Sequence, residues 1–429
     1  MNKQQKIAVI GAGPMGLAVA YQLIQEGKKP VVFESDDRVG GMTATFDFDG
    51  VDIERYYHFH CTSDDDFFLM LEELGIEDKL KWVKTKMGYW FNNRLQEWGN
   101  PLALLKFKGL GMVAKFRYGL HAFLSTKRNN WQPLEKQDAK TWVKKWVGTE
   151  AYEKLWKKLF ELKFYHHTDN LSAPWIWSRI RRVGRSRYNI FNEKLGYLEG
   201  GSNTLLQALK EYIEQNGGEI RLNAGVTKVN LSDGVVKSVV ADNETLVFDK
   251  VISTVPLPLV AKIIPDLPKP ILNKYQSKSS IGVICVIAKL SKQLTQNFWL
   301  NTNDDEMDIP GIIEYSNLNP EVGHVVYVPY YMPREHEKFT HSDEVYRKKV
   351  SSYFKKINSS LTDADILDIR VHRYAFAQPI CEPNFLDTLP PESPTTGLWA
   401  ADTSFYYPED RGISESIGYG RAMVKRVLS

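Results

Sequence analysis

The residues with the clearest chemical meaning are three glycines and an acid near the start of the chain. Gly11, Gly13 and Gly16 form a G-x-G-x-x-G pattern, and Glu34 follows 23 residues after the first of them. Such glycines permit a tight turn, close approach of the backbone to a pyrophosphate, and close packing of a helix on a strand. The carboxylate would accept hydrogen bonds from a ribose diol. The pattern predicts a dinucleotide site, with NAD and FAD both open at this point.

The segments around these residues are expected to form the frame of that site. The pattern over residues 6–23 and 31–34 predicts a strand, the glycine turn, a helix, and a second strand that ends at the acid. Pro14 and Met15 stand at the expected start of the helix, where free N–H groups and the positive end of the helix dipole would meet the phosphates. Strand, helix and distal acid together favour a dinucleotide site over a merely structural turn.

A second glycine pair decides between the two cofactors. Gly40 and Gly41 follow the acid closely, where an extended FAD needs close backbone approach and an NAD dehydrogenase does not. The stretch ESDDRVGGMTATF resembles the start of the FAD-dependent superfamily that contains amine oxidases, protoporphyrinogen oxidases, phytoene desaturases and UDP-galactopyranose mutases. The resemblance implies that the loop after the second strand also binds the cofactor, through Glu34, Ser35, Arg38, Gly40, Gly41 and Met42.

The far end of the chain resembles the closing motif of the same superfamily. The stretch GLWAADTSFYYPEDRGISESIGYGRAMVKRVL implies a strand, then Asp402 bonded to the ribityl chain, then a last helix. Gly412 and Ile413 would place the start of this helix at the pyrimidine edge of the flavin, where a helix N-terminus stabilises negative charge. Ala401 stands where the superfamily usually has glycine. The stretch NAGVTKV is similar to the strand on which such proteins rest the adenine, with Val226 offering backbone contacts.

The order of these pieces predicts the fold class and the domains. The resemblance implies an α/β protein with a Rossmann-like FAD-binding domain of the GR2 type, an inserted helical cap and a β-sheet substrate domain. We expect the FAD-binding domain to be discontinuous, at 1–65, 192–265 and 380–429. The insertion 66–191 has helical spacing in segments such as AYEKLWKKLFELKF, and 266–379 has strand-like runs such as SIGVICVIAKL and HVVYVPYYM.

The length and composition of the chain limit the number of domains and the classes of partner that we expect. At 429 residues the chain is longer than one hydrophobic core usually serves, so two or more subdomains are expected. A net charge of +3 neither favours nor excludes nucleic acid, and no nucleic-acid-binding motif is present. Cys61, Cys285 and Cys381 lack any zinc spacing and fit a reducing, cytoplasmic home. Apolar runs such as Ile281–Ala288 are shorter than the roughly 18 residues of a membrane span.

Catalytic residues are harder to predict because a flavin performs the redox chemistry itself. The segment with Arg55, His58 and His60 passes the flavin ring in the superfamily, and we expect a strand there with both histidines on one side. UDP-galactopyranose mutases carry H-x-x-H near this place, so only His58 can be matched to the H-x-H found here. These histidines either take part in the reaction or only form hydrogen bonds in a domain interface. A metal site is not expected, because the sequence offers no third ligand. Amine oxidases of this superfamily use a lysine in a strand of the substrate domain. Lys289 lies a few residues too far along the chain to match it, which disfavours amine oxidation.

Two basic regions bear on the substrate. Five arginines lie within residues 179–187 with no acid among them. Because guanidinium groups match phosphate geometry, Arg179, Arg182 and Arg185 are candidates to bind an anion such as a nucleotide sugar or a prenyl pyrophosphate; a solvated basic face is the alternative. The segment Trp98–Leu134 interleaves cations with aromatic and aliphatic residues and contains no acid. This composition suits contact with a membrane surface, or a packed core with cationic edges.

The sequence as a whole predicts an FAD-dependent oxidoreductase. We expect it to transfer a hydride between flavin and an anionic or amphiphilic small molecule, in cell-surface polysaccharide or isoprenoid metabolism. The alternative is a redox-neutral nucleotide-sugar mutase that uses reduced flavin. We expect a small-molecule substrate, no nucleic acid and no metal, in the cytoplasm or at the inner face of the membrane through Trp98–Leu134.

Overall fold

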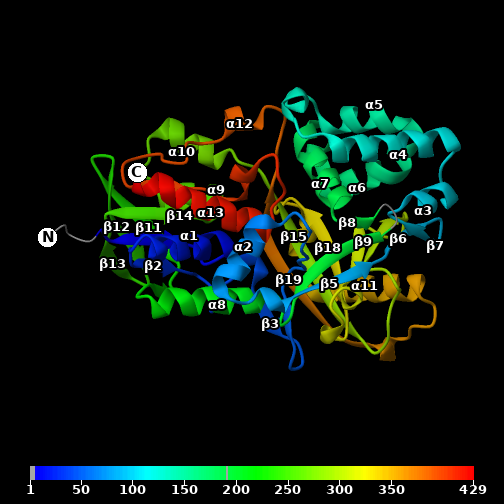
Figure 1. The fold of residues 1–429 in the computed structure, drawn as a ribbon, viewed down its shortest axis with the longest axis horizontal. Coiled ribbons are helices and arrows are strands. Elements are labelled where there is room, and N and C mark those ends of the chain that lie inside the picture. The colour runs from blue at the N-terminus through cyan, green and yellow to red at the C-terminus, as the bar shows by residue number, and fades with distance from the viewer. Residues whose placement is uncertain (1–4, 190–191) are drawn as a thin grey trace.

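The computed structural model describes residues 5–189 and 192–429, and its elements form a mixed α/β fold (Figure 1). Gln5, the first described residue, and the C-terminus lie at one end of the elongated molecule, beside a parallel sheet. A group of helices and a large mixed sheet form the other end. The chain crosses between the two ends several times, so that each end is built from segments distant in sequence.

The parallel sheet has five strands and brings the start, middle and end of the chain together. In spatial order they are β10 (Glu219–Arg221), β2 (Pro30–Phe33), β1 (Ile7–Ile10), β14 (Lys250–Ser253) and β20 (Leu398–Ala400). The central strand, with sequence IAVI, is buried along its whole length, as expected for a strand covered on both faces. The predicted pair of strands and the closing strand therefore lie in one sheet.

Helices cover one face of this sheet, and a small antiparallel sheet covers the other. The helices are α1 (Pro14–Gln25), α2 (Asp65–Leu74), α8 (Ser202–Gln215) and α13 (Ile413–Leu428). Their apolar side chains share one core with β1 and β14. The opposite face carries β11 (Val226–Ser232), β12 (Val235–Ala241), β13 (Glu244–Val247), α9 (Leu257–Ile263) and α10 (Lys269–Gln276).

A seven-stranded sheet forms the centre of the other end. Its spatial order is β19 (Ile366–Pro379), β15 (Ser280–Leu290), β18 (His324–Met332), β17 (Gly311–Glu314), β16 (Trp299–Asn303), β6 (Met87–Phe91) and β7 (Arg94–Trp98). Neighbouring strands are antiparallel, except that β16 and β6 are parallel. Helix α11 (Asp343–Ile357) packs on one face, and α12 (Phe385–Thr388) follows β19 in the chain.

The segment 66–191 is not the purely helical cap that the sequence suggested. It contributes β6 and β7 to the seven-stranded sheet, and β5 (Leu80–Thr85) and β8 (Arg187–Asn189) to a small sheet with β9 (Asn192–Leu198). The β6–β7 hairpin turns at Asn92 and Asn93, which both have positive φ. Asparagine pairs are typical of such two-residue turns, so this dipeptide was the available signal. The remaining short pair is β3 (Thr45–Asp47) with β4 (Asp52–Glu54).

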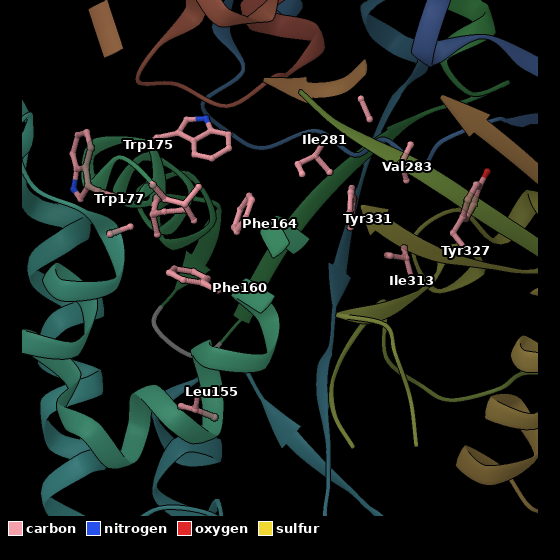
Figure 2. Packing of buried hydrophobic residues seen from close by; sticks show 14 of the residues in the cluster. Leu155, Phe160, Phe164, Trp175, Trp177, Ile281, Val283, Ile313, Tyr327 and Tyr331 are labelled. Atoms are coloured by element: carbon pink, nitrogen blue, oxygen red, sulfur yellow. The ribbon is translucent and has the colours of Figure 1, made fainter. Parts of the chain in front are cut away.

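Five helices of this segment pack against the sheet and against one another. They are α3 (Pro101–Lys106), α4 (Met112–Lys127), α5 (Ala139–Ala151), α6 (Lys157–Phe164) and α7 (Ala173–Arg185). In Figure 2 the side chains of Phe160 and Phe164 of α6 lie between those of two groups, which are Trp175 and Trp177 of α7 and Ile281, Val283 and Tyr331 of β15 and β18. The ring of Phe164 on α6 lies 5.5 Å from that of Trp175 on α7, with both rings in one large core. This core anchors the helices to the sheet.

Close packing of α13 on α1 gives a first prediction. A Cβ at Gly420 of α13 would stand 2.7 Å from the carbonyl oxygen of Met15, whereas a Cβ at Gly119 of α4 would make ordinary contact with Leu104. We expect Gly420→Ala to destabilise the protein by about 1–3 kcal/mol through overpacking. The same change at Gly119 should stabilise it by about 0.4–1 kcal/mol, since alanine favours helix. Thermal unfolding followed by circular dichroism measures both; equal melting temperatures would contradict the helix contact.

Candidate active site

The first glycine turn links β1 to α1 and leaves open space in front of the helix. Gly11 has φ +98°, and a Cβ at Gly16 would overlap the Gly11 carbonyl oxygen, so neither position accepts a side chain without strain. Gly13 caps α1 with no side-chain hydrogen bond, and the nearest atom to a Cβ built there is 4.0 Å away. Pro14 and Met15 begin the helix as expected. Uncapped N–H groups facing unfilled space suit a phosphate.

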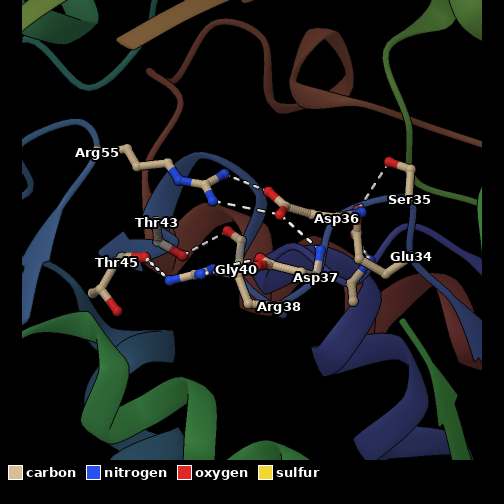
Figure 3. Close-up of polar contacts among 10 residues, drawn as sticks. Glu34, Ser35, Asp36, Asp37, Arg38, Gly40, Thr43, Thr45 and Arg55 are labelled. Carbon is tan, nitrogen blue, oxygen red and sulfur yellow. Dashed lines mark hydrogen bonds and ion pairs between the residues drawn. The ribbon is translucent and has the colours of Figure 1, made fainter. Parts of the chain in front are cut away.

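Glu34 holds the first glycine turn against the end of β2. Its carboxylate accepts hydrogen bonds from the backbone N–H of Ala12 at 2.8 Å and of Asp36 at 2.9 Å, and from the hydroxyl of Ser35 at 3.1 Å (Figure 3). Each carboxylate oxygen has room for more than one donor, so these bonds leave capacity for a ribose hydroxyl. The backbone N–H of Ala224 donates to the Glu34 carbonyl oxygen, which brings the chain just before Val226 to the same place.

The second glycine loop packs directly on the first. The backbone N–H of Gly40 donates to the Ala12 carbonyl oxygen at 2.8 Å, and a Cβ at Gly41 would lie 3.4 Å from the Gly13 Cα. Arg38 is engaged locally, since its guanidinium pairs with Asp37 and donates to the Thr45 carbonyl oxygen. The predicted loop therefore adjoins the predicted turn.

Arg55 is engaged with the second glycine loop. Its guanidinium forms an ion pair with Asp36 of that loop, as Figure 3 shows. Arg55 does not line the large cavity that holds His58. The ion pair gives Arg55 a place in the framework of the loop, and a catalytic role for it stays a prediction.

The closing segment brings Asp402 and the start of α13 to the same region. The Asp402 carboxylate accepts the backbone N–H groups of Leu257 at 2.9 Å and Ser404 at 2.8 Å, and burial raises its pKa. It therefore ties β20 to the start of α9, a structural task that the sequence did not reveal. Gly412 caps α13 without a side-chain hydrogen bond, and Gly412 and Ile413 line the cavity together with Met42.

A cavity of about 1090 Å³ extends from these residues into the helical end of the molecule. Its walls come from the 56–61 segment, α3, α4, α6, α7 and the strands of the seven-stranded sheet. Most of its side chains are aromatic or aliphatic, among them Tyr89, Trp98, Leu104, Tyr118, Phe123, Leu159, Phe160, Ile180 and Trp299. Phe123 lines the cavity and is 58% exposed, so the cavity opens to the outside beside α4.

His58 and His60 have different surroundings, and the chain between Arg55 and Phe59 is irregular and does not form the expected strand. The Nδ1 atom of His58 lies 2.6 Å from Glu54 Oε2, and Glu54 Oε1 accepts the backbone N–H of Ser202 at 3.0 Å. His58 lines the cavity and is thus an imidazole oriented by a buried carboxylate. His60 is buried and stacks on Phe67 at 3.8 Å, and burial lowers its pKa.

The three arginines chosen from the sequence all line the cavity, but two of them already face acids. Arg179 pairs with Asp410 at 2.7 Å, and Arg182 pairs with Asp64 at 3.1 Å. Arg185 donates to the side chain of an asparagine, Asn129. Because these acids come from distant parts of the chain, the local absence of acids around the arginines gave no sign of them.

Several cavity residues escaped the sequence reasoning altogether. They are the tyrosines Tyr57 and Tyr331 and the polar side chains Lys163, Gln378 and Arg411. Glu54, which contacts the cavity residue His58 from behind the wall, was missed as well. Arg411 lies inside the closing motif and donates to Gln378, but the motif gave it no separate role. No spacing in the sequence marks Lys163, which lies on a helix chosen only for its amphipathic pattern.

Comparison with known proteins agrees with this geometry. A family described as flavin containing amine oxidoreductase matches residues 16–379. The chain belongs to this family. The predictions of FAD as the cofactor and of kinship with FAD-dependent amine oxidases and protoporphyrinogen oxidases are confirmed. In the described part of the chain, no helix is long and apolar enough to cross a bilayer.

Phytoene desaturases and a protoporphyrinogen oxidase are among the relatives of this chain. The 15-cis-phytoene desaturase of Capsicum annuum is 26% identical over 330 residues, which cover 71% of this chain and 55% of the relative. Protoporphyrinogen oxidase 2 of Arabidopsis thaliana is 30% identical over 129 residues, or 29% of this chain and 25% of the relative. The chain spans about half the length of the phytoene desaturases that it matches.

Solved structures share the fold over the whole chain. An oxidoreductase from Methanosarcina mazei has a TM-score of 0.74 at 19% identity, covering 98% of this chain and all of its own. Wild-type putrescine oxidase bound to putrescine has a TM-score of 0.72 at 16% identity, covering 99% of each chain. The mixed α/β fold is therefore that of FAD-dependent amine oxidases.

Gly13 offers a test that separates cofactor binding from folding. Alanine there fits the observed φ of −72° and would meet no atom closer than 4.0 Å, so the fold should tolerate it. The methyl group would nevertheless fill the space expected for the pyrophosphate, and FAD should bind at least about tenfold more weakly. Flavin content after purification and reconstitution of the apoprotein measure this effect. If Gly13→Ala retains FAD like the parent protein, the phosphates lie elsewhere.

Proposed function

We propose that the protein is an FAD-dependent oxidoreductase that transfers a hydride between flavin and an amphiphilic small molecule held in the large cavity. The observation that carries this proposal is the course of the cavity. It begins at Met42, Gly412 and Ile413, next to the two glycine loops, and ends at Phe123 on the surface. A mostly apolar cavity of this kind suits a substrate with a long hydrophobic part.

The parallel sheet and its helices would form the Rossmann-like FAD-binding domain of the GR2 type. Its pieces would be 1–65, 192–265 and 380–429, with 66–191 and 266–379 enclosing the cavity. The proposed contacts follow the chain: the first glycine turn for the pyrophosphate, Glu34 for the adenosine ribose, Val226 for the adenine, Asp402 for the ribityl chain, and Gly412 with Ile413 for the pyrimidine edge. FAD, when bound, supplies the hydride acceptor or donor.

The residues of the chain itself would bind, orient and exchange a proton with the substrate. Glu54 holds His58 through Nδ1, so the imidazole is fixed in one orientation and its Nε2 remains to accept a proton. The Glu54 carboxylate is in turn fixed by the Ser202 backbone N–H. A base held by a buried acid is the usual arrangement of a positioned proton acceptor. The surrounding aromatic walls would keep water out.

The side chains exposed on the outer face of α3 and α4 support the proposal that an amphiphilic substrate reaches the cavity from a lipid surface. Large apolar side chains stand exposed on these two helices: Leu102, Leu105, Met112, Val113, Phe116, Leu120, Phe123 and Leu124. Exposed apolar patches of this kind are typical of interaction sites. Lys106, Lys108 and Lys127 are exposed around this face, which favours an anionic membrane surface as the partner.

The mutase alternative has less support from the site. Arg179 and Arg182 are paired with acids, so they are not free to hold a diphosphate in the arrangement described. An anaerobic screen of amphiphilic acids, polyprenyl phosphates, porphyrinogens, nucleotide sugars and amines, read by bleaching of the flavin, tests the proposal. Bleaching by an amphiphile with net loss of two electrons from it would support an oxidoreductase. A redox-neutral isomer of a nucleotide sugar would overturn it.

His58 provides the catalytic prediction. His58→Ala should retain FAD, because within 5–189 and 192–429 the imidazole bonds only to Glu54, yet lose about two or more decades of turnover with the substrate found by the screen. Stopped-flow measurement of flavin reduction gives this rate. As a control, His60→Phe keeps the stack on Phe67 and should turn over normally. Normal flavin reduction by His58→Ala would make His58 structural.

The exposed helix face gives a prediction about lipid binding. Replacing both Val113 and Phe116 by serine should lower binding to phosphatidylglycerol vesicles at least about tenfold, because each side chain contributes roughly 1.5 kcal/mol or more when buried. Co-sedimentation with the vesicles measures it. The control is Val247→Ser on β13, since Val247 is 68% exposed against 75% for Val113. Equal sedimentation of the two variants would exclude this face as the docking surface.

A further inference from the structure

The wall of the cavity nearest α13 carries an excess of buried positive charge. Lys163 of α6, Arg179 of α7 and Arg411 line this wall together with a single carboxylate, Asp410. Asp410 is already bound, because it pairs with Arg179 at 2.7 Å and accepts the backbone N–H of Arg411 at 2.9 Å. The cluster therefore holds more cations than anions in a mostly apolar surrounding. Burying charge in this way is costly unless an anion balances it.

Among the described residues neither Lys163 nor Arg411 forms an ion pair with an acid, and Arg411 is engaged by Gln378. Within the same part of the chain the ammonium of Lys163 has no hydrogen-bond or ion-pair partner and lies over the ring of Tyr331, 5.1 Å from the centroid. The hydroxyl of Tyr331 in turn lies 3.4 Å from that of Tyr57, and both rings line the cavity. An ammonium over an aromatic face is attracted to the ring but keeps all three of its N–H donors available.

The side-chain amide of Gln378 at the same wall has a partner for its oxygen but none for its nitrogen among the described residues. Gln378, at the end of β19, is 1% exposed, and its Oε1 accepts a hydrogen bond from Arg411. That bond orients the amide so that Nε2 becomes a buried donor with no acceptor among the residues that the structure describes. Buried donors are almost always satisfied, so an unpaired one at a cavity wall indicates an acceptor supplied by a ligand.

We propose that Lys163, Gln378 and Arg411 form a subsite for the carboxylate of an amphiphilic substrate at the inner end of the cavity. This inference rests on the proposed function, since it names the head group of the molecule held there. The two oxygens of a carboxylate match an ammonium on one side and a planar amide with its guanidinium on the other. The hydrophobic part of the same molecule would extend along the aromatic walls toward Phe123.

The charge of Lys163 makes the subsite sensitive to pH. Burial, with Arg179 and Arg411 as neighbouring cations, lowers the pKa of Lys163 to about 7, although Asp410 opposes the shift. The aromatic rings of Tyr331 and Phe164 also face the Lys163 ammonium. Below pH 7 the ammonium is present and attracts a carboxylate; above pH 7 it loses its proton and the attraction falls. A carboxylate probe stays ionised throughout this range.

Isothermal titration of the FAD-loaded protein with decanoate and with 1-decanol tests the subsite. Lys163→Met should weaken decanoate binding about tenfold to a hundredfold and leave decanol unchanged. Lys163→Arg should retain decanoate binding and remove its decline between pH 6 and about 8.5, since arginine stays charged. The matched control is Lys157→Met on the same helix, where Lys157 pairs with Glu153 at 3.1 Å on the outer surface.

A second variant guards against effects on folding. Gln378→Glu is isosteric and places a carboxylate where the ligand is expected, so it should abolish decanoate binding and spare decanol. The subsite would be overturned if Lys163→Met bound decanoate as tightly as the parent protein, or if it lost affinity equally for decanoate and decanol. Neither result would contradict the proposal that the cavity binds an amphiphile. If the parent protein binds decanol but not decanoate, the subsite is again excluded. If it binds neither probe, the amphiphile cavity of the proposed function fails, and the subsite with it.

Discussion

The packing of one glycine loop on another is the constraint on which the rest of the site depends. The N–H of Gly40 bonds to the Ala12 carbonyl oxygen, and Glu34 binds the N–H of the same Ala12 from the other side. The second loop can turn here because Gly40, with φ +123°, and Gly41, with φ +54°, adopt backbone conformations that favour glycine. The start of α1, the end of β2 and the 40–42 segment are thereby fixed in one place. Met42, which faces the cavity, directly follows the glycine pair held by that contact.

The helical end is tied to this frame by buried charge as well as by apolar packing. Arg182 of α7 reaches Asp64 just before α2, and Arg179 reaches Asp410 just before α13. Paired charges of this kind contribute little net stability, but removing one partner leaves the other buried and unpaired, which is strongly destabilising. They therefore fix the position of α7 relative to the two helices of the parallel-sheet unit. The cavity lies between the parts that these pairs connect.

The spacing of nearby residues predicted the strands, turn and helix that frame the site. It could not predict contacts between residues that lie far apart in the sequence. The strand, turn and helix at Gly11–Gly16 follow from a spacing of a few residues, and the structure forms them as expected. The partners of Arg179 and Arg182 lie more than 100 residues away in sequence, so no local pattern could show that these guanidinium groups were already neutralised. The partner of Arg55, Asp36, lies only 19 residues away, but no spacing rule marks such a pair, so the sequence did not show it.

The opening of the cavity beside Phe123, within an apolar surface, affects how a substrate would arrive. A molecule dissolved in a lipid layer would reach this opening by diffusion in two dimensions and would never cross bulk water. Its supply would then depend on its mole fraction in the lipid and on the area of lipid per protein molecule, and adding more lipid at a fixed amount of substrate would dilute it. A rate measured in detergent would report the composition of the micelle as much as the enzyme.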